Sequence, residues 1–262
     1  MGAVREIMLN IMLSGCCGSM GRAVTAFAYI RDDIRITAGI DREGRECKFP
    51  TFVSPFSFNG KVDVIIDFSS PAALPGLLEY AVSAKTPAVI ATTGLSEAHI
   101  ALIYKAAKEI PIFFSANMSL GINLLCELAK TAARVLGGTY DIEIVETHHA
   151  QKTDAPSGTA LMLADAISSE LERKPYYEYD RHLRRTKRPH DEIGIHSIRG
   201  GTAVGEHEII FAGYNETIKL SHCAQSKELF AAGAVNAAKF IQNKEPGLYG
   251  MSDMIDRKDA KK

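Results

Sequence analysis

The feature that most constrains the fold is a regular exchange of short apolar runs and amphipathic stretches in the first half of the chain. The apolar runs predict strands at 7–13, 34–41, 62–68, 87–94 and 111–117. The amphipathic stretches predict helices at 20–32, 71–84 and 96–109. Because the strand segments are apolar almost throughout, both of their faces must be buried, which is typical of a parallel sheet covered by helices on both sides. We therefore expect a doubly wound α/β domain.

The pattern changes after residue 120. Helices are predicted at 121–137, 157–173 and 227–243, and alternating strands at 140–149, 193–201, 205–213 and 216–224. Strict alternation indicates strands with one buried face. The last three strands are separated by turn residues, and they favour an antiparallel sheet whose other face is open or covered by a partner. The second half is therefore predicted to be an α+β domain with a mixed, largely antiparallel sheet.

The composition excludes several classes of protein. The 262 residues carry a net charge of -1, so no global field exists to attract nucleic acid or an acidic membrane. The basic run at 181–192 ends in two acids and is predicted to be a solvated connecting loop. No stretch approaches the length of a transmembrane helix, and the broken apolar run at 7–13 suits a first strand better than a signal peptide.

The five cysteines are scattered and contain no CxxC pair. The sequence therefore signals neither a disulfide framework nor a zinc site, and we predict no metal. A reducing cytoplasm fits this cysteine usage best.

A glycine-rich segment, LSGCCGSMGRAV (13–24), lies between the first predicted strand and the first predicted helix. Gly15, Gly18 and Gly21 permit a tight turn and a close approach of the backbone to a pyrophosphate. The N–H groups and the positive dipole end of the following helix then stabilise the negative charge of that pyrophosphate. Cys17 stands where the usual motif has its middle glycine. Such turns also serve packing alone, so the segment by itself leaves both interpretations open.

The residues that follow the next strands favour a dinucleotide site. Asp41 comes twenty positions after Gly21, where an acid can accept hydrogen bonds from the ribose of NADH. Arg42 can pair with the 2′-phosphate of NADPH, although the two residues can also simply end a strand. ATTG (91–94) and SANMS (115–119) follow later strands, and their small side chains leave room for a cofactor at the sheet edge.

The segment ETHHAQKTDAPSGTA (146–160) concentrates groups that hold and protonate an acidic substrate. His148 and His149 end an alternating strand, so their side chains point in opposite directions. Lys152 adds a cation that can pair with a carboxylate or donate a proton.

The end of this segment is expected to begin a helix. Asp154 can cap it, Pro156 suits its first turn, and Ser157-Gly158-Thr159 presents backbone N–H groups to a carboxylate. The histidine pair can also be a structural hydrogen-bonding device and the lysine a solvated loop residue, although the pattern favours a catalytic role. A metal site lacks a third ligand with suitable spacing.

The same segment resembles the signature of the dihydrodipicolinate reductase family, also called 4-hydroxy-tetrahydrodipicolinate reductases. The family pattern E-x-HH-x-x-K-x-DAPSGTA is matched from Glu146 to Ala160. The resemblance covers nearly the whole chain, and the order of its segments is more specific than any one of them. Those segments are GCCGSMGR, IDREG, VIIDFSSP, ATTG, SANMSLGIN, SIRGGTAVGEHEIIF and ETIKLSHCAQSKELFAAGAVNAA.

The resemblance implies roles for individual residues. His148 matches the catalytic proton donor and acceptor, and Lys152 matches a proton donor. Substrate contacts are implied for His149, Gly158 and Thr159. Cofactor contacts are implied for Gly15, Cys16, Cys17, Gly18, Ser19, Met20, Asp41, Arg42, Ala91, Thr92, Thr93, Ser115, Ala116, Asn117 and Met118.

The resemblance also implies an activity and an assembly. We expect NADH- or NADPH-dependent reduction of (2S,4S)-4-hydroxy-2,3,4,5-tetrahydrodipicolinate, a dicarboxylate, with loss of water, in lysine and diaminopimelate synthesis. The implied fold is a Rossmann-like dinucleotide-binding domain (1–119 and 228–262) and a substrate-binding domain (120–227) whose sheet builds a homotetramer.

The chain departs from the family pattern at a few positions. The family often has arginine where Ser19 stands, which puts the preference for NADPH in question. Ala91 replaces a common glycine, Lys227 a common arginine and Met118 a common phenylalanine. Cys16 and Cys17 in the glycine loop suggest the hypothesis that the enzyme is sensitive to oxidants.

Two other functions fit the same fold: a nicotinamide-dependent reductase of another small imino acid, and a dinucleotide-binding protein without turnover. The retained signature from Glu146 to Ala160 counts against both. An acylating semialdehyde dehydrogenase needs a poised cysteine nucleophile, and neither Cys126 nor Cys223, within a predicted helix and strand, fits that role.

Overall fold

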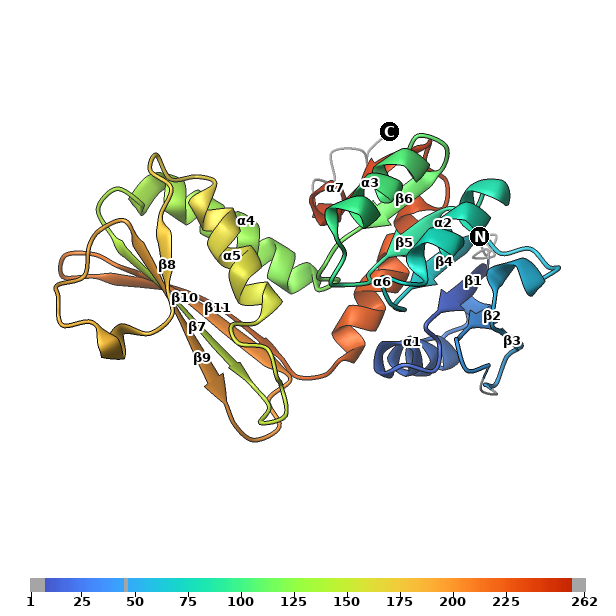
Figure 1. Ribbon diagram of the computed structural model, residues 1–262, viewed down its shortest axis with the longest axis horizontal. Coiled ribbons are helices and arrows are strands. Elements are labelled where there is room, and N and C mark those ends of the chain that lie inside the picture. The colour runs from blue at the N-terminus through green and yellow to red at the C-terminus, as the bar shows by residue number, and fades with distance from the viewer. Residues whose placement is uncertain (1–7, 45–46, 256–262) are drawn as a thin grey trace, which may run out of the picture. The chain divides into compact units, whose positions relative to one another are not determined.

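A computed structural model describes residues 8–44 and 47–255 of the chain. These residues form two compact units (Figure 1). The first unit contains the described residues up to Ser119 and those from Lys227 onward, and the second contains Leu120–Ser226. Within the described ranges, no helix combines the length and the apolar character that crossing a bilayer requires.

The first unit is built on a parallel sheet, as the sequence predicts. Its strands, in the spatial order β12-β6-β5-β4-β1-β2-β3, are all paired in parallel. The strands are β1 (Leu9–Ser14), β2 (Ile34–Ile40), β3 (Thr51–Phe52), β4 (Val64–Asp67), β5 (Ala88–Ile90), β6 (Pro111–Phe114) and β12 (Gly247–Tyr249). The helices are α1 (Ser19–Tyr29), α2 (Leu74–Ser83), α3 (Glu97–Ala106), α6 (Glu228–Ile241), α7 (Met251–Ile255) and a 3₁₀ turn at Pro55–Ser57.

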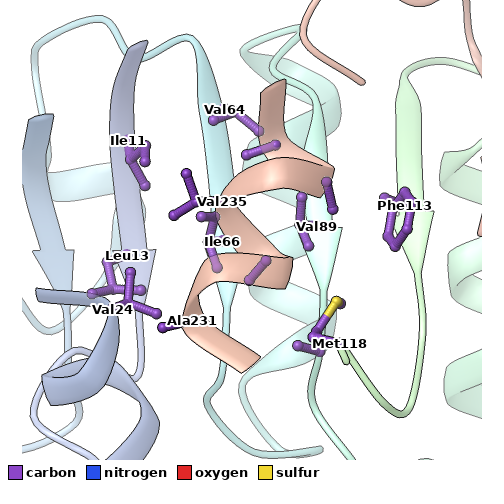
Figure 2. Close-up of a cluster of buried hydrophobic side chains, with 14 of the residues drawn as sticks. Ile11, Leu13, Val24, Val64, Ile66, Val89, Phe113, Met118, Ala231 and Val235 are labelled. Carbon is purple, nitrogen blue, oxygen red and sulfur yellow. The ribbon is translucent and has the colours of Figure 1, made fainter. Parts of the chain in front are cut away.

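Helices cover both faces of this sheet, which explains why its strands are apolar throughout. Ile11 and Leu13 of β1 belong to one buried cluster, whereas Met12 between them belongs to another on the opposite face. The first cluster, shown in Figure 2, also contains Ala231 and Val235 of helix α6. A segment from the C-terminal part of the chain therefore completes the core of the N-terminal sheet.

The second unit contains a mixed sheet in the spatial order β11-β10-β7-β9-β8. Its strands are β7 (Asp141–His148), β8 (Tyr176–Glu178), β9 (Glu192–Arg199), β10 (Gly205–Ala212) and β11 (Thr217–Ala224). Its helices are α4 (Leu120–Leu136), α5 (Gly158–Ser168) and a 3₁₀ turn at Arg181–Leu183.

The sheet is mixed, as expected, but its pairing differs in part from the antiparallel arrangement expected for its last three strands. Strand β10 is antiparallel to β7 and β11, but β9 pairs in parallel with β7 and β8. Strand β7 lies between β9 and β10, although β9 and β10 follow one another in the chain. Alternation reveals which face of a strand is buried but not the direction of its neighbour, so the sequence pattern could not distinguish the two arrangements.

Helices α4 and α5 cover one face of this sheet (Figure 1). Along β7, Ile142 and Ile144 are buried in the core beneath these helices. Because successive side chains alternate, Glu146 and His148 lie on the same face and are also buried, nearer the end of the strand. The buried face of β7 thus changes from apolar to ionisable as the strand ends.

The basic segment at 181–192 is not merely a solvated loop, contrary to the sequence-based expectation. Arg181 pairs with the buried carboxylate of Glu192, with Nη1 to Oε2 at 2.7 Å. Arg188 donates through Nε to Glu143 at 2.9 Å and through Nη2 to the carbonyl of Glu192 at 2.6 Å. The charges of this segment therefore fix it to the sheet of its own unit.

Candidate active site

The glycine loop after β1 forms a tight turn. Gly15 has φ of +75°, a conformation that favours glycine, and its N–H donates to the carbonyl of Ile40 at 2.8 Å. The N–H of Gly18 donates back to the carbonyl of Gly15 at 3.0 Å. A Cβ at Gly21 would lie 2.3 Å from that same carbonyl oxygen, so only glycine allows helix α1 to pack this closely. These are the steric demands of a loop that carries a pyrophosphate at a helix start.

The start of helix α1 offers backbone N–H groups and a nearby cation. Its N-cap is Gly18, and no side chain caps it. Ser19 and Met20 form its first turn, and Lys227 donates to the Ser19 hydroxyl with Nζ to Oγ at 3.3 Å. Lys227 therefore supplies a positive charge at the place where the family often has an arginine at position 19. In the sequence, Lys227 stands out only as a substitution for a common arginine, and no local pattern indicates this contact.

Asp41 follows β2 directly and is fixed to the glycine loop. Its carboxylate accepts hydrogen bonds from the N–H of Cys17 at 3.3 Å and the N–H of Glu43 at 3.1 Å. Arg42 has 92% of its side chain exposed and lies 3.8 Å from the Glu43 carboxylate. The acid is thus preorganised beside the loop, whereas the guanidinium extends into solvent.

The loops that follow β5 and β6 are held by short polar contacts. Thr92 donates its hydroxyl to the buried carboxylate of Asp67, with Oγ1 to Oδ2 at 2.6 Å. Burial raises the pKa of Asp67, and the hydrogen bonds from Ser69 and Thr92 oppose this rise. Ser115 donates to the carbonyl of Asn117 at 2.8 Å. These contacts attach the two loops to the sheet edge.

The residues predicted for cofactor binding differ in what they can offer. The spatial order β6-β5-β4-β1-β2 brings their loops together along one edge of the parallel sheet. Cys16, Ala91 and Met118 have buried side chains within the core of this unit (Met118 is labelled in Figure 2), so their backbone is the part that can face a dinucleotide. Thr93 and Ala116 are exposed.

In the second unit, His148 lies in a network of buried polar groups. Its Nδ1 is 2.6 Å from Oε2 of Glu146, whose side chain is fully buried. Arg199 pairs with both carboxylate oxygens of Glu146 at 2.8 and 2.7 Å, and the N–H of Ser157 donates to the same carboxylate at 3.1 Å. Burial raises the pKa of Glu146, but Arg199 and the other donors outweigh it and lower the pKa to about 2. Glu146 is therefore a carboxylate at neutral pH.

This network defines the state of the His148 ring. Because the Glu146 carboxylate accepts at Nδ1, the neutral ring carries its proton there and leaves Nε2 as the reactive atom. Burial lowers the pKa of His148, although Glu146 acts against this effect. A Cβ on Gly205 would lie 3.0 Å from Nε2, so the glycine keeps space beside that atom.

A second histidine supports the start of helix α5. His207 Nε2 lies 3.0 Å from Ser157 Oγ, and Ser157 caps the helix by accepting from the N–H of Ala160 at 3.1 Å. Burial, together with the neighbouring ring of His148, lowers the pKa of His207 to about 4. His207 is thus neutral at physiological pH, and sequence analysis did not identify it.

The loop between β7 and α5 orients the remaining candidates. Lys152 pairs with Asp154, its Nζ lying 2.7 and 2.9 Å from the two carboxylate oxygens. Arg199 also donates to the carbonyl of Asp154, at 2.6 Å. The N–H of His149 donates to the carbonyl of Ala203 at 2.8 Å. The loop is therefore held by the same arginine that pairs with Glu146.

The helix start differs in detail from the sequence-based expectation. Ser157 is the N-cap, so Asp154 does not cap the helix and Pro156 precedes its first turn. Gly158 and Thr159 are the first helical residues, as expected for backbone N–H groups facing a carboxylate. The alternation of residues 140–149 puts Glu146 on the same face of the strand as His148, so the sequence already indicates Glu146 as a partner of the histidine. No pattern in the sequence indicates that Arg199 belongs to this network.

Together, a parallel sheet with a glycine loop and an acid fixed to that loop, and a second unit with a carboxylate-oriented histidine, define a nicotinamide-dependent oxidoreductase. Sequence models of the N-terminus and the C-terminus of dihydrodipicolinate reductase match residues 9–118 and 121–255. The chain therefore belongs to the dihydrodipicolinate reductase family.

Curated relatives agree with this assignment over nearly the full chain. A 4-hydroxy-tetrahydrodipicolinate reductase from Caldanaerobacter subterraneus is 50% identical over 251 residues, which is 96% of this chain and 100% of that protein. The enzyme of the same name from Clostridium botulinum is 48% identical over 249 residues, covering 95% and 98% of the two chains.

Solved structures share the fold. A dipicolinate-bound dihydrodipicolinate reductase from Paenisporosarcina superposes with a TM-score of 0.78 at 22% identity, covering 95% of this chain and 100% of that one. A probable dehydrogenase from Thermotoga maritima superposes with a TM-score of 0.61 at 13% identity, covering 94% and 92%. These likenesses confirm the expected fold class.

Proposed function

We propose that this chain reduces (2S,4S)-4-hydroxy-2,3,4,5-tetrahydrodipicolinate to (S)-2,3,4,5-tetrahydrodipicolinate with loss of water, using NADH or NADPH, in lysine and diaminopimelate synthesis. Membership of the family and relatives of this name at 50% and 48% identity support the proposal. The observation that carries it is the buried hydrogen bond between His148 and Glu146, which gives the histidine a defined tautomer beside a helix start suited to a carboxylate.

The first unit is proposed to bind NADH or NADPH. When bound, the dinucleotide would supply a hydride to the substrate. The N–H groups of the glycine loop and the start of α1 suit the pyrophosphate, and Lys227 adds positive charge beside Ser19. Asp41, which is fixed to the glycine loop, is proposed to accept from the ribose, and the exposed Arg42 is proposed to pair with a 2′-phosphate. The loops at 91–93 and 115–118 are proposed to line the nicotinamide side.

The second unit is proposed to hold the dicarboxylate and handle its protons. The first N–H groups of α5 and the ammonium of Lys152 suit one carboxylate. His149, Gly158 and Thr159 are proposed substrate contacts. His148 Nε2 is the proposed site of proton exchange with the substrate, and Lys152 is a proposed proton donor once a substrate competes with Asp154 for it.

A coupled assay tests this proposal. The substrate is generated from aspartate semialdehyde and pyruvate by a purified synthase, and oxidation of NADH and of NADPH is followed by absorbance. Oxidation should require the synthase and should collapse in His148→Gln and Lys152→Ala. The matched controls His182→Gln and Lys61→Ala, at exposed positions outside these groups, should retain activity.

The assay also separates the alternatives. Cofactor binding without any oxidation would favour a binding protein on the same fold. Oxidation with a different imino acid but not with this substrate would favour another reductase.

We further propose that the chain assembles as a homotetramer through the face of the second sheet opposite α4 and α5. That face carries apolar side chains, including Val145, Ile210 and the half-exposed Ile198. Burial of such residues between subunits stabilises an assembly. Light scattering after gel filtration should give four times the mass of one chain, and Ile198→Glu should reduce it.

A further inference from the structure

The structure brings together two consecutive cysteines and a third that lies 30 positions after the second. Cys16 and Cys17 belong to the glycine loop, and Cys47 belongs to the segment between β2 and β3. The sulfur of Cys17 lies 3.8 Å from that of Cys16 and 3.6 Å from that of Cys47. All three sulfurs lie within 4.8 Å of one another. We call these residues the three-cysteine cluster.

These separations match those of thiolates around one metal ion. Zinc binds sulfur at about 2.3 Å in tetrahedral geometry, which places neighbouring sulfurs about 3.8 Å apart. The two shorter separations in the cluster are within about 0.2 Å of this value. Little movement is needed, therefore, for one cation to contact all three sulfurs.

Backbone hydrogen bonds hold the parts of the chain that carry these cysteines. Gly15 and Cys16 both donate to the carbonyl of Ile40, at 2.8 and 3.3 Å, which ties the glycine loop to β2. The N–H of Gly39 donates to the carbonyl of Pro50 at 2.8 Å, so the segment with Cys47 returns to the same strand. A preformed site requires less ordering of the chain when a ligand binds.

The packing around Cys16 leaves space for its sulfur only because residue 39 has no side chain. A Cβ at Gly39 would lie 2.7 Å from Cys16 Sγ and 2.6 Å from the ring of Phe49. Only glycine at this position leaves room for the thiol beside the sheet.

The cluster also has access and compensating charge. The three cysteines line a cavity of about 640 Å³ together with Arg22, Tyr29 and Lys48. This cavity provides an entry path and room for a water as fourth ligand. Three thiolates and a divalent cation carry one net negative charge, which the two basic side chains can balance.

We propose that Cys16, Cys17 and Cys47 form a binding site for a thiophilic cation, with zinc bound by the three sulfurs and a water. Soft thiolate ligands select zinc or monovalent copper over magnesium and calcium. The proposed reaction uses the backbone of the glycine loop and none of these sulfurs. A cation there links the glycine loop to the segment after β2.

Metal titration of the full-length, reduced protein tests the proposal. Cobalt(II) is the spectroscopic probe, because thiolate coordination gives an intense charge-transfer band that oxygen and nitrogen ligands do not give. We expect one cobalt per chain with this band, its displacement by zinc, and no response to magnesium. Zinc should also raise the melting temperature, because a ligand that binds only the folded state stabilises it.

Variants assign the site. Cys47→Ser removes one ligand from a partly exposed position and should lower zinc affinity at least ~100-fold, since even residues that only orient metal ligands matter 10–100-fold. The matched control Cys223→Ser removes an exposed thiol outside the cluster and should bind like the wild type. Circular dichroism should show that both variants fold.

Three outcomes would overturn the proposal: no thiolate band in the reduced protein, an unchanged band in Cys47→Ser, or a Cys17–Cys47 disulfide whose reduction restores no metal uptake. None of these readouts uses NADH, NADPH or turnover, so failure of the metal site and failure of the proposed reaction are distinguished.

Discussion

Replacement of Glu146 by glutamine is the sharpest test of the proton-handling network. The change keeps the shape of the side chain but removes the charge that accepts from His148 Nδ1 at 2.6 Å. A glutamine amide can donate to Nδ1 instead, which would move the ring proton to Nε2, the reactive atom. We therefore expect kcat to fall by about 10²–10⁴, the usual range for loss of general acid–base catalysis.

The same change should destabilise the second unit. Arg199 pairs with both oxygens of the fully buried Glu146, and 19% of its own side chain is exposed. Removing one partner of a buried ion pair costs about 3–5 kcal/mol. Because water reaches part of the arginine, we expect the lower end of this range, about 3 kcal/mol.

A matched control lies on the same strand. Glu143 accepts from Arg188 at 2.9 Å and from His196 at 2.7 Å, but on the opposite face of β7. Glu143→Gln should therefore lower stability in urea unfolding while kcat in the coupled assay stays near the wild-type value. The reasoning fails if Glu146→Gln keeps wild-type kcat, or if Glu143→Gln loses activity to the same degree.

Three further predictions follow from the described contacts. Lys227→Ala should weaken NADH and NADPH binding about tenfold or more in a fluorescence titration, because a charge-assisted hydrogen bond contributes about 1.5–3 kcal/mol; an effect no larger than that of Lys61→Ala would contradict this role. Binding of dipicolinate should be accompanied by uptake of a proton near pH 7, because burial lowers the pKa of His148 and a dianion beside the ring raises that pKa again. Calorimetry in buffers of different ionisation enthalpy measures this proton uptake. His148→Gln should abolish it. Burial lowers the pKa of His207 in the folded state to about 4, whereas the unfolded state keeps the ordinary value of about 6.5. As pH drops below about 6.5, the unfolded state therefore binds this proton before the folded state does. About 3 kcal/mol of the free energy of unfolding present above pH 6.5 should be lost by about pH 4. Urea midpoints in His207→Gln should lack this part of the pH dependence, and an unchanged slope would show that another group causes it.

The parallel sheet was predictable because its strands carry two independent signals, continuous apolarity and intervening helices. The strands β3, β8 and β12 were missed because two or three residues are too few to show a period. The parallel pairing of β9 with β7 was missed because alternation contains no information on strand direction.

The candidate site was predictable where a motif is local in sequence. The glycine loop and the segment from Glu146 to Ala160 are of this kind. Arg199 and His207 reach the site from other strands and became visible only through the fold. Burial likewise turns the Met118 side chain into the core and leaves only its backbone at the sheet edge, and no local pattern in the sequence shows this.

The position of helix α6 has a consequence for how the chain is made. The second unit is continuous in sequence, so a nascent chain that has just passed Ser226 already contains all of it. The sheet of the first unit, by contrast, waits for Ala231, Val235 and their neighbours to cover one face. At about 5–20 residues per second, that wait lasts on the order of 10 s. During translation the first unit is therefore the last to acquire its complete core, and one apolar face of its sheet stays uncovered until α6 has been made.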